Sequence, residues 1–177
     1  MRLSVIALGA VAICLSTFSN SRIAAQESCD IPKVLSDALR GKYPELTVLR
    51  INDLPQSDRE LFQKEHGQDC AGMTKVDFYG DGAPTWALVL VPSEKNGGSA
   101  KLILARKGSR GFEFSALDSA NQPTAVVWQA PSGTYSDLES DKTIRAKHQV
   151  LVFASYESWA IVYAWMDNHI GKVWLAD

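Results

Sequence analysis

The feature that most constrains the fold is an alternation of apolar and polar residues that begins at Thr74 and continues to the C-terminus. Turn residues interrupt it about every ten residues, which is typical of strands joined by hairpins in an antiparallel sheet. The segment 130–148 is polar and long, and we expect it to cap an end of the sheet. The predicted strands are 74–80, 85–91, 100–106, 111–117, 124–129, 149–157, 159–166 and 171–176.

Helical signals are confined to the segment before this sheet. Residues 30–41 combine an N-cap, a proline in the first turn, an apolar stripe and a glycine stop, which together predict a helix. A second helix is predicted over 55–67, where Ser57 and Glu60 have the spacing of a capping box. Between the two, residues 45–51 alternate weakly and predict a short strand.

The segment 159–166, WAIVYAWM, is apolar on both faces and therefore predicts a central strand that is covered on each side. We expect the two helices to cover its small-residue face, and sheet curvature or the 130–148 loop to close its aromatic face. The predicted fold class is α+β, with two N-terminal helices packed on a curved, mainly antiparallel β-sheet of about six to eight strands.

All five tryptophans lie on predicted strands. This placement favours an aromatic core. The alternative is an exposed platform on which sugars or a partner chain stack.

The first 25 residues have the layout of a secretory signal peptide, with Arg2 near the start, an apolar core over 3–15 and small residues at Ala24 and Ala25. This apolar core is shorter than the roughly 20 residues that a bilayer span needs. We therefore predict cleavage near Ala25, a single α+β domain over 26–177, a secreted or periplasmic location, and no stable membrane insertion.

Cleavage would remove Cys14 and leave two cysteines, Cys29 and Cys70. In an oxidising compartment such a pair usually forms a disulfide. Closing a loop of about 40 residues should stabilise the fold by about 3 to 4 kcal/mol in the chain-entropy model. A redox role has little support, because the sequence has no C-x-x-C.

The charge balance excludes one class of partner. Cleavage removes two arginines and no acid, which leaves 16 Lys and Arg against 20 Asp and Glu and a net charge of -4. The chain therefore lacks the basic footprint of a nucleic-acid-binding protein, and we expect no nucleic-acid partner.

The stretch DFYGDG, which starts at Asp77, places acidic and glycine residues before a very apolar segment. A calcium loop of the EF-hand kind needs oxygen ligands at its first, third, fifth and twelfth positions. Counted from Asp77, the third position is Tyr79 and the twelfth is Leu88, so only Asp77 and Asp81 supply carboxylates. The count favours a hairpin turn in which glycines supply positive φ and the Asp side chains satisfy loop amides.

The same stretch resembles the D-x-x-G-D-G-x-x-D loop of FG-GAP and VCBS-type repeats. Asp77, Gly80, Asp81 and Gly82 match that pattern, whereas Thr85 replaces the closing acid. The resemblance covers about sixteen residues of one unit, and it implies a strand–loop–strand unit that can hold calcium.

Catalytic signatures are absent from the sequence. His66, His148 and His169 lack metal-ligand spacing, and there is no nucleophile elbow, P-loop or dinucleotide fingerprint. We therefore assign no catalytic residue, no metal ligand and no cofactor. The alternative is a carboxylate pair that only the fold brings together, and the first residues to inspect are Asp77, Asp81, Glu157 and Asp167.

These observations predict an exported, non-enzymatic binding or inhibitor-type protein whose partner is an unknown protein or glycan. The binding residues are not assigned, but the sheet face and the 130–148 loop are the expected surfaces. Two alternatives remain: a cell-wall or carbohydrate-directed hydrolase that uses carboxylates, and a calcium-binding module of the FG-GAP or VCBS kind.

Overall fold

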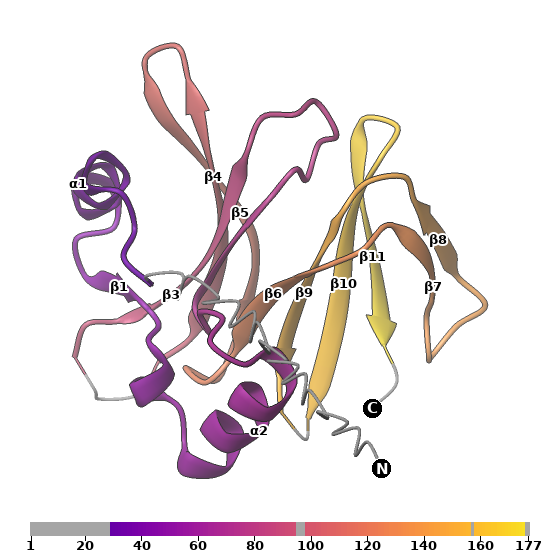
Figure 1. The fold of residues 1–177 in the computed structure, drawn as a ribbon, viewed down its shortest axis with the longest axis horizontal. Coiled ribbons are helices and arrows are strands. Elements are labelled where there is room, and N and C mark those ends of the chain that lie inside the picture. The colour runs from indigo at the N-terminus through magenta and orange to yellow at the C-terminus, as the bar shows by residue number, and fades with distance from the viewer. Residues whose placement is uncertain (1–28, 95–97, 157, 176–177) are drawn as a thin grey trace, which may run out of the picture.

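Two antiparallel sheets dominate the protein, as seen in a computed structural model that describes residues 29–94, 98–156 and 158–175 (Figure 1). The first sheet has the order β1-β3-β4-β5, and β2 also pairs with β3. Residues 90–92 of β3 pair with β1, whereas residues 85–88 pair with β2. Its strands are β1 (Leu46–Val48), β2 (Met73–Val76), β3 (Thr85–Pro92), β4 (Ala100–Gly108) and β5 (Gly111–Ala120).

The second sheet has the order β11-β10-β9-β6 and lies beside the first (Figure 1). A separate two-stranded sheet pairs β7 with β8. The strands are β6 (Val126–Ala130), β7 (Gly133–Ser136), β8 (Thr143–Ala146), β9 (Val150–Ser155), β10 (Trp159–Met166) and β11 (His169–Leu175).

The largest hydrophobic cluster joins the inner faces of the two main sheets. The backbone N–H of Val127 in β6 donates to the carbonyl of Ala71, just before β2, at 2.9 Å, so main-chain bonding also links the two sheets. Because period-two segments alternate their side chains between faces, each sheet presents one apolar face that the other can bury. Members of the cluster include Val89, Leu102, Leu104, Phe153, Ile161 and Tyr163.

The predicted α+β arrangement is wrong, because the protein is mainly β. The two helices, α1 (Lys33–Lys42) and α2 (Gln56–His66), are short, and between them lie β1 and the 3₁₀ turn η1 (Ile51–Asp53). Leu35 of α1 packs in a cluster with Leu88 on the outer face of the first sheet, whereas Phe62 of α2 belongs to the cluster between the sheets. The helices therefore do not form a common layer. The single curved sheet is also replaced by two sheets that cover each other.

The cover of β10 is the reverse of the expectation. Its aromatic face, with Ile161 and Tyr163, packs between the two main sheets. Its small-residue face, with Val162 and Ala164, packs against β8. No helix takes part in that described cluster.

The segment 130–148, predicted as a loop, contains the β7–β8 hairpin that supplies this cover. Tyr135 pairs with Ile144, and both pack on the second sheet, whereas their neighbours Thr134 and Arg145 are exposed. A hairpin that exposes one face to solvent has a largely polar sequence. For this reason the sequence of the segment resembles that of a loop.

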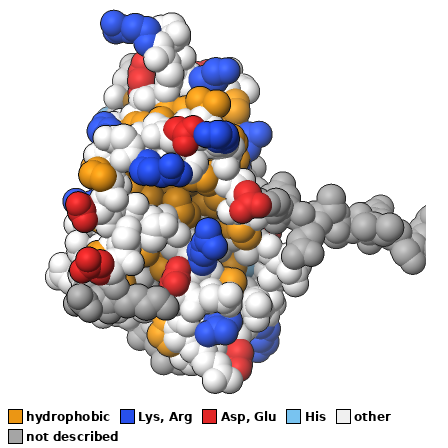
Figure 2. All heavy atoms as spheres, turned by 90° about the vertical axis from the view of Figure 1, so that its left-hand side faces the viewer, with side chains coloured by type: hydrophobic (Ala, Val, Ile, Leu, Met, Phe, Trp, Pro, Cys, Tyr) orange, Lys and Arg blue, Asp and Glu red, His pale blue; other side chains and the backbone are white. Residues whose placement is uncertain are grey.

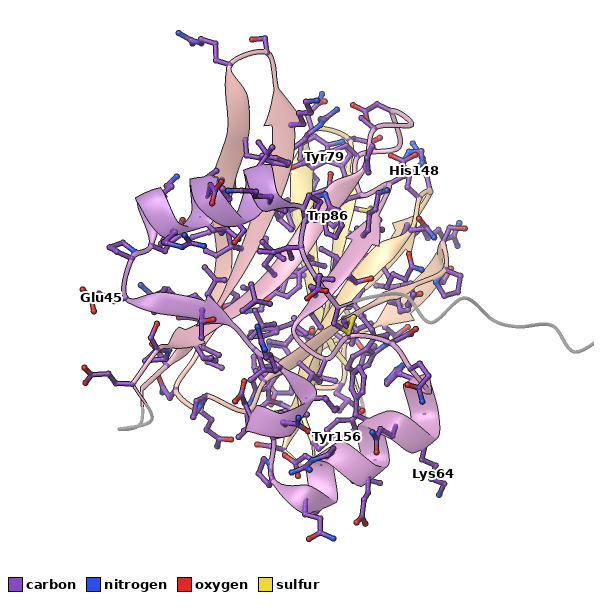
Figure 3. The ribbon with its side chains drawn as sticks, turned by 60° about the vertical axis from the view of Figure 1, so that its left-hand side comes forward. Glu45, Lys64, Tyr79, Trp86, His148 and Tyr156 are labelled. Carbon is purple, nitrogen blue, oxygen red and sulfur yellow. A yellow bond between two sulfur atoms is a disulfide. The ribbon has the colours of Figure 1, made fainter. Side chains whose placement is uncertain are left out.

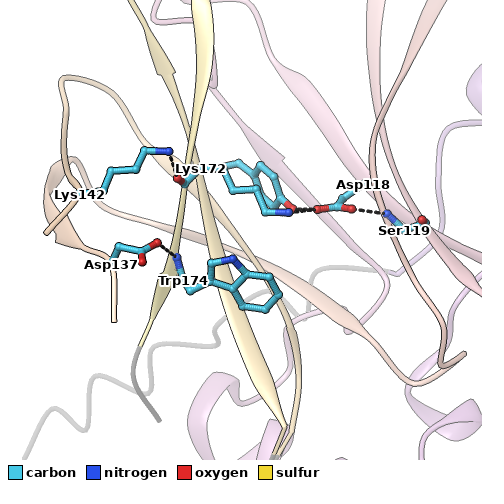
Figure 4. A network of polar contacts seen from close by, with 7 residues as sticks. Asp118, Ser119, Asp137, Lys142, Lys172 and Trp174 are labelled. Carbon is cyan, nitrogen blue, oxygen red and sulfur yellow. Dashed lines mark hydrogen bonds and ion pairs between the residues drawn. The ribbon is translucent and has the colours of Figure 1, made fainter. Parts of the chain in front are cut away.

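A polar cluster connects β5 of the first sheet with β10 and β11 of the second (Figure 4). A register shift in β5 between the partners of Leu102 and Ile103 places Asp118 opposite Leu102, facing the second sheet. There its carboxylate accepts hydrogen bonds from the Tyr163 hydroxyl and from Lys172 Nζ, the latter at 2.7 Å. Burial by itself raises the pKa of Asp118, but the bonds from Lys172, Tyr163 and the Ser119 amide outweigh it and lower the pKa.

The predicted disulfide is confirmed: Cys29 is bonded to Cys70, with their Cα atoms 5.5 Å apart. The bond ties the segment before α1 to the connection between α2 and β2. Disulfides of this kind persist in oxidising compartments.

The predicted signal peptide lies outside the described residues. Within the described part of the chain, the helices are too short or too polar to cross a membrane.

Candidate functional site

The Asp-Gly stretch forms the connection between β2 and β3, and the hairpin interpretation of it is confirmed. The Asp77 carboxylate accepts hydrogen bonds from the backbone N–H groups of Asp81 and Gly82, both at 3.1 Å. Gly80 and Gly82 have φ values of +71° and +78°, in the left-handed region that glycine adopts without strain. The strand predicted over 74–80 ends at Val76, because the chain turns at Asp77.

Asp81 already has a cationic partner. One of its carboxylate oxygens accepts the Ala83 N–H at 3.1 Å, and the other is paired with Arg106 of β4. The Ala83 N–H and Arg106 together hold the pKa of Asp81 below its usual range. Among the described residues, no group of three or more His, Cys, Asp or Glu could hold a metal ion. Calcium binding therefore stays a prediction that the resemblance alone supports.

A pocket of ≈ 490 Å³ lies where this loop meets two other connections. Tyr79 comes from the β2–β3 loop, His148 from the β8–β9 connection and Trp165 from the end of β10. Figure 3 shows Tyr79 and His148 side by side at one end of the molecule, away from Lys64 of α2. The remaining lining residues are Arg145, Lys147, Met166, Asp167 and Asn168.

Gly80 allows the two loops to touch. A Cβ atom added to Gly80 would lie 2.2 Å from the His148 ring, so only glycine lets this ring pack on the loop backbone. The neighbouring Tyr79 ring contacts Trp165 edge-on, with ring centroids 4.8 Å apart. Burial raises the pKa of the Tyr79 hydroxyl, which therefore stays protonated at neutral pH. The pocket thus has two aromatic side chains that hold each other in place.

Positive charge predominates in the pocket lining. Lys147 Nζ lies 3.0 Å from the Asp167 carboxylate at the rim. Arg145, on the exposed face of β8, adds a second cation that the lining acids do not balance. Asp167 and Asn168 have φ values of 40° and 79°, which form the tight turn predicted between the last two strands. This turn places Asp167 opposite Lys147.

The structure separates the carboxylates that the sequence singled out. Asp77 and Asp81 bind their own loop and Arg106, and only Asp167 lines the pocket. Glu157 lies outside the described residues. Of the histidines, His148 lines the pocket, His66 ends α2 half-buried, and His169 is exposed at the start of β11. Among the described residues, these carboxylates therefore do not form a pair that faces this pocket.

Sequence reasoning missed Tyr79, Arg145, Lys147 and Trp165 as members of one site. A signal was present: Arg145, Lys147 and His148 cluster directly before a strongly apolar strand, and binding residues are often found on loops that a rigid scaffold positions. Trp165 had been assigned to an aromatic core, and it is in fact half-buried, with one side on the core and the other on the pocket.

The likeness of residues 77–85 to FG-GAP and VCBS loops is local, and nothing in the rest of the structure tests it. Comparisons of the chain with protein-family models, curated proteins and solved structures find no match.

Proposed function

We propose that the protein is an exported, non-enzymatic binding protein that holds an acidic saccharide in the pocket between Tyr79, His148 and Trp165. The observation that carries this proposal is the presence of an ordered aromatic pair beside unbalanced positive charge in one pocket. The volume of the pocket falls within the range of about 300 to 1,000 Å³ that is common for small-ligand sites.

The aromatic pair supports a ring-shaped ligand. Tyr79 and Trp165 are each half-buried and contact each other, so they lose little conformational freedom when a ligand covers them. Aromatic side chains offer a rigid apolar surface with a polar tip, which suits the mixed apolar and hydroxyl faces of a sugar ring.

The charges support an acidic ligand. Arg145 presents a planar group with several donors that matches a carboxylate in two-point fashion. Lys147 is held by Asp167 at 3.0 Å, which orients its ammonium group at the rim. A sugar acid would thus meet the aromatic rings with its ring and the two cations with its carboxylate.

Binding is favoured over hydrolysis because of how the acids are used. Acid–base cleavage of a glycosidic bond needs two carboxyl groups that face the same cleft, about 5 to 10 Å apart. Asp167 is the one carboxylate among the described residues that line this pocket, and it is paired with Lys147. The predicted signal peptide and the Cys29–Cys70 disulfide support an exported location.

The test is a titration of the purified protein with trigalacturonate and with the neutral galactose trisaccharide. Tryptophan fluorescence and calorimetry report binding. We expect saturable one-to-one binding of the acidic sugar, weaker binding of the neutral sugar, and an affinity that falls as salt is added. Arg145→Ala should weaken binding about tenfold or more.

The matched control is Lys64→Ala, which removes an exposed cation at the opposite end of the molecule (Figure 3). It should leave binding unchanged. Equal affinity for both sugars, or an Arg145→Ala variant that binds like the wild type, would contradict the proposal. Shortened sugar products after incubation would show an enzyme instead. Mass spectrometry of the protein recovered from its own cells or medium tests export, with Gln26 expected as the first residue.

A further inference from the structure

A second hollow lies on another side of the molecule, between α1, β1 and η1. It has a volume of ≈ 510 Å³. Figure 2 views this side and shows hydrophobic side chains at the bottom of a hollow whose margin carries charged side chains. It shares no lining residue with the pocket that contains Tyr79 and His148, so it can be tested separately.

The floor of this hollow is apolar. Leu39 of α1 and Leu90 of β3 are buried there, and Leu46 and Val48 of β1 are half-buried beside them. Together with Met73 they belong to the cluster on the outer face of the first sheet. A ligand that covers this floor would remove apolar surface from water, which favours binding by roughly 25 cal/mol per Å².

Two arginines from different elements line the same hollow. Arg40 lies in the last turn of α1, and Arg50 comes directly before η1. Arg40 has only long contacts with its own helix, at 3.9 Å to Asp37 and 3.5 Å to the Ser36 hydroxyl. Asp30 is the one acid among the described lining residues, so the lining carries an excess of one positive charge.

One wall of the hollow is covalently fixed. Cys29 and Cys70 both line it, and their disulfide holds the start of α1 against the segment before β2. The other wall is α1, which packs on the sheet through Leu35 and Leu39. A site whose walls are held in place before binding loses less entropy when a ligand enters.

We infer that this hollow binds one free long-chain carboxylate, with its hydrocarbon chain on the apolar floor and its carboxylate held by Arg40 and Arg50. The apolar floor selects the chain, and the unbalanced arginine charge selects the anionic head group. This ligand differs in chemistry from the acidic sugar proposed for the other pocket, because it needs an apolar chain. The inference therefore goes beyond the proposed function and does not depend on it.

The probe is dodecanoate, titrated calorimetrically into the purified protein below its micelle-forming concentration. The comparison ligand is dodecyltrimethylammonium, which has the same chain and the opposite charge. We expect dodecanoate to bind one-to-one and the cation to bind at least about tenfold more weakly.

Four variants test the location of the site. Arg40→Gln and Arg50→Gln should each weaken dodecanoate binding several-fold, whereas Arg110→Gln in the β4–β5 turn should not change it. Leu46→Trp adds bulk at a half-buried position of β1 on the floor of the hollow, so it should block binding while leaving the circular dichroism spectrum unchanged. None of the four variants should alter binding of trigalacturonate, which separates this inference from the proposed function.

Four outcomes would overturn the inference: equal binding of the cationic amphiphile, binding of more than one equivalent, wild-type affinity in the double variant Arg40→Gln/Arg50→Gln, or wild-type affinity in Leu46→Trp. Sedimentation with phosphatidylglycerol vesicles without one-to-one binding of dodecanoate would also overturn it, because that result indicates a membrane surface as the partner.

Discussion

The carboxylate of Asp137 accepts a hydrogen bond from the backbone N–H of Trp174 at 2.9 Å, on the outer edge of β11 (Figure 4). The carbonyl of the same tryptophan accepts the N–H of Leu138 at 3.1 Å, and Lys142 Nζ donates to the Lys172 carbonyl at 2.6 Å. The β7–β8 connection thus occupies main-chain groups that an edge strand otherwise offers to another chain. The Trp174 N–H also holds the pKa of Asp137 below its usual range.

Replacing Asp137 should therefore expose this edge. We expect Asp137→Ala to self-associate at concentrations where the wild type does not, because the freed N–H of Trp174 can pair with a second chain. Light scattering coupled to size-exclusion chromatography measures the mass. Glu139→Ala removes a neighbouring exposed acid and should keep the wild-type mass. A monodisperse Asp137→Ala variant with that mass would contradict the role of Asp137.

The two loop glycines form a matched pair for a test of the pocket. Alanine at Gly80 or Gly82 must adopt a left-handed conformation, which costs about 1 to 2 kcal/mol. At Gly80 the added Cβ also meets the His148 ring, whereas at Gly82 it meets nothing within 4 Å. Urea unfolding should show a larger loss of stability for Gly80→Ala, and only this variant should weaken trigalacturonate binding. Equal losses of stability and of binding in the two variants would contradict this, because they would mean that the His148 ring moves away from the added Cβ atom at no cost.

The Asp118 cluster should stabilise the pairing of the two sheets. Tyr163→Phe removes a buried hydroxyl that donates to Asp118. Burial, followed by the hydrogen bond to Asp118 and by the charge of Asp118, raises the pKa of this tyrosine. We expect Tyr163→Phe to lower the free energy of unfolding by about 1 to 3 kcal/mol, the usual range for hydrogen bonds to charged groups. A double-mutant cycle with Asp118→Asn should give a coupling of about 1 kcal/mol. Additive effects would show that the two side chains act independently.

His66 should make stability depend on pH. The centroid of its ring lies 4.8 Å from that of Phe62 and 4.6 Å from that of Trp128. Its Nε2 atom is buried without a hydrogen bond to the described residues. Burial lowers the pKa of His66 below 6.5, although Glu65 and Asp69 partly oppose this. The unfolded chain therefore binds the proton more readily than the folded protein.

The stabilisation from neutral His66 is thus fully present above about pH 6.5 and is lost as the pH falls below that value. Urea unfolding of the wild type from pH 7.5 to 5.5 should show this decline. His66→Phe keeps an aromatic ring without the titrating group, so its stability should change less over the same range. Parallel pH profiles would indicate that other groups cause the dependence.

The disulfide should contribute to stability on the scale that its loop length predicts. The bonded cysteines are 41 residues apart. We expect the double variant Cys29→Ala/Cys70→Ala to have a free energy of unfolding about 3 to 4 kcal/mol lower than that of the wild type, as measured by urea unfolding. Adding a reductant should destabilise the wild type and leave the variant unchanged. Reductant-insensitive unfolding of the wild type would contradict this.

Local patterns in the sequence predicted local structure well. The period-two segments became strands, and the Asp167–Asn168 turn joins the last two of them. Both helices form within a few residues of their predicted bounds, but the predicted side-chain caps are wrong, because Pro32 and Pro55 occupy the N-cap positions. These features depend on neighbouring residues, so a single sequence can reveal them. The Asp77 loop was predicted for the same reason, because the residue types in DFYGDG specify the hydrogen bonds that the loop makes.

The incorrect predictions concern which elements cover each face of the sheets. The helices were expected over the small-residue face of β10, but the β7–β8 hairpin covers it instead. An apolar strand indicates that it needs a cover and carries no information about the identity of that cover. The site was missed for a similar reason, since Tyr79, Arg145 and Trp165 come from three separate parts of the chain.

By itself, the sequence determined where most strands, turns and helices form, although not β7 and β8. It also determined that two cysteines could pair and that DFYGDG would make a self-contained loop, because each depends on local conformational preferences or on simple counting. Only the tertiary structure decided that two sheets bury each other, that Asp137 occupies the edge of β11, and that the Gly80 loop packs under His148 beside Trp165. Those relationships join residues far apart in the chain, and the packing of whole elements selects among the many covers that their apolar faces allow.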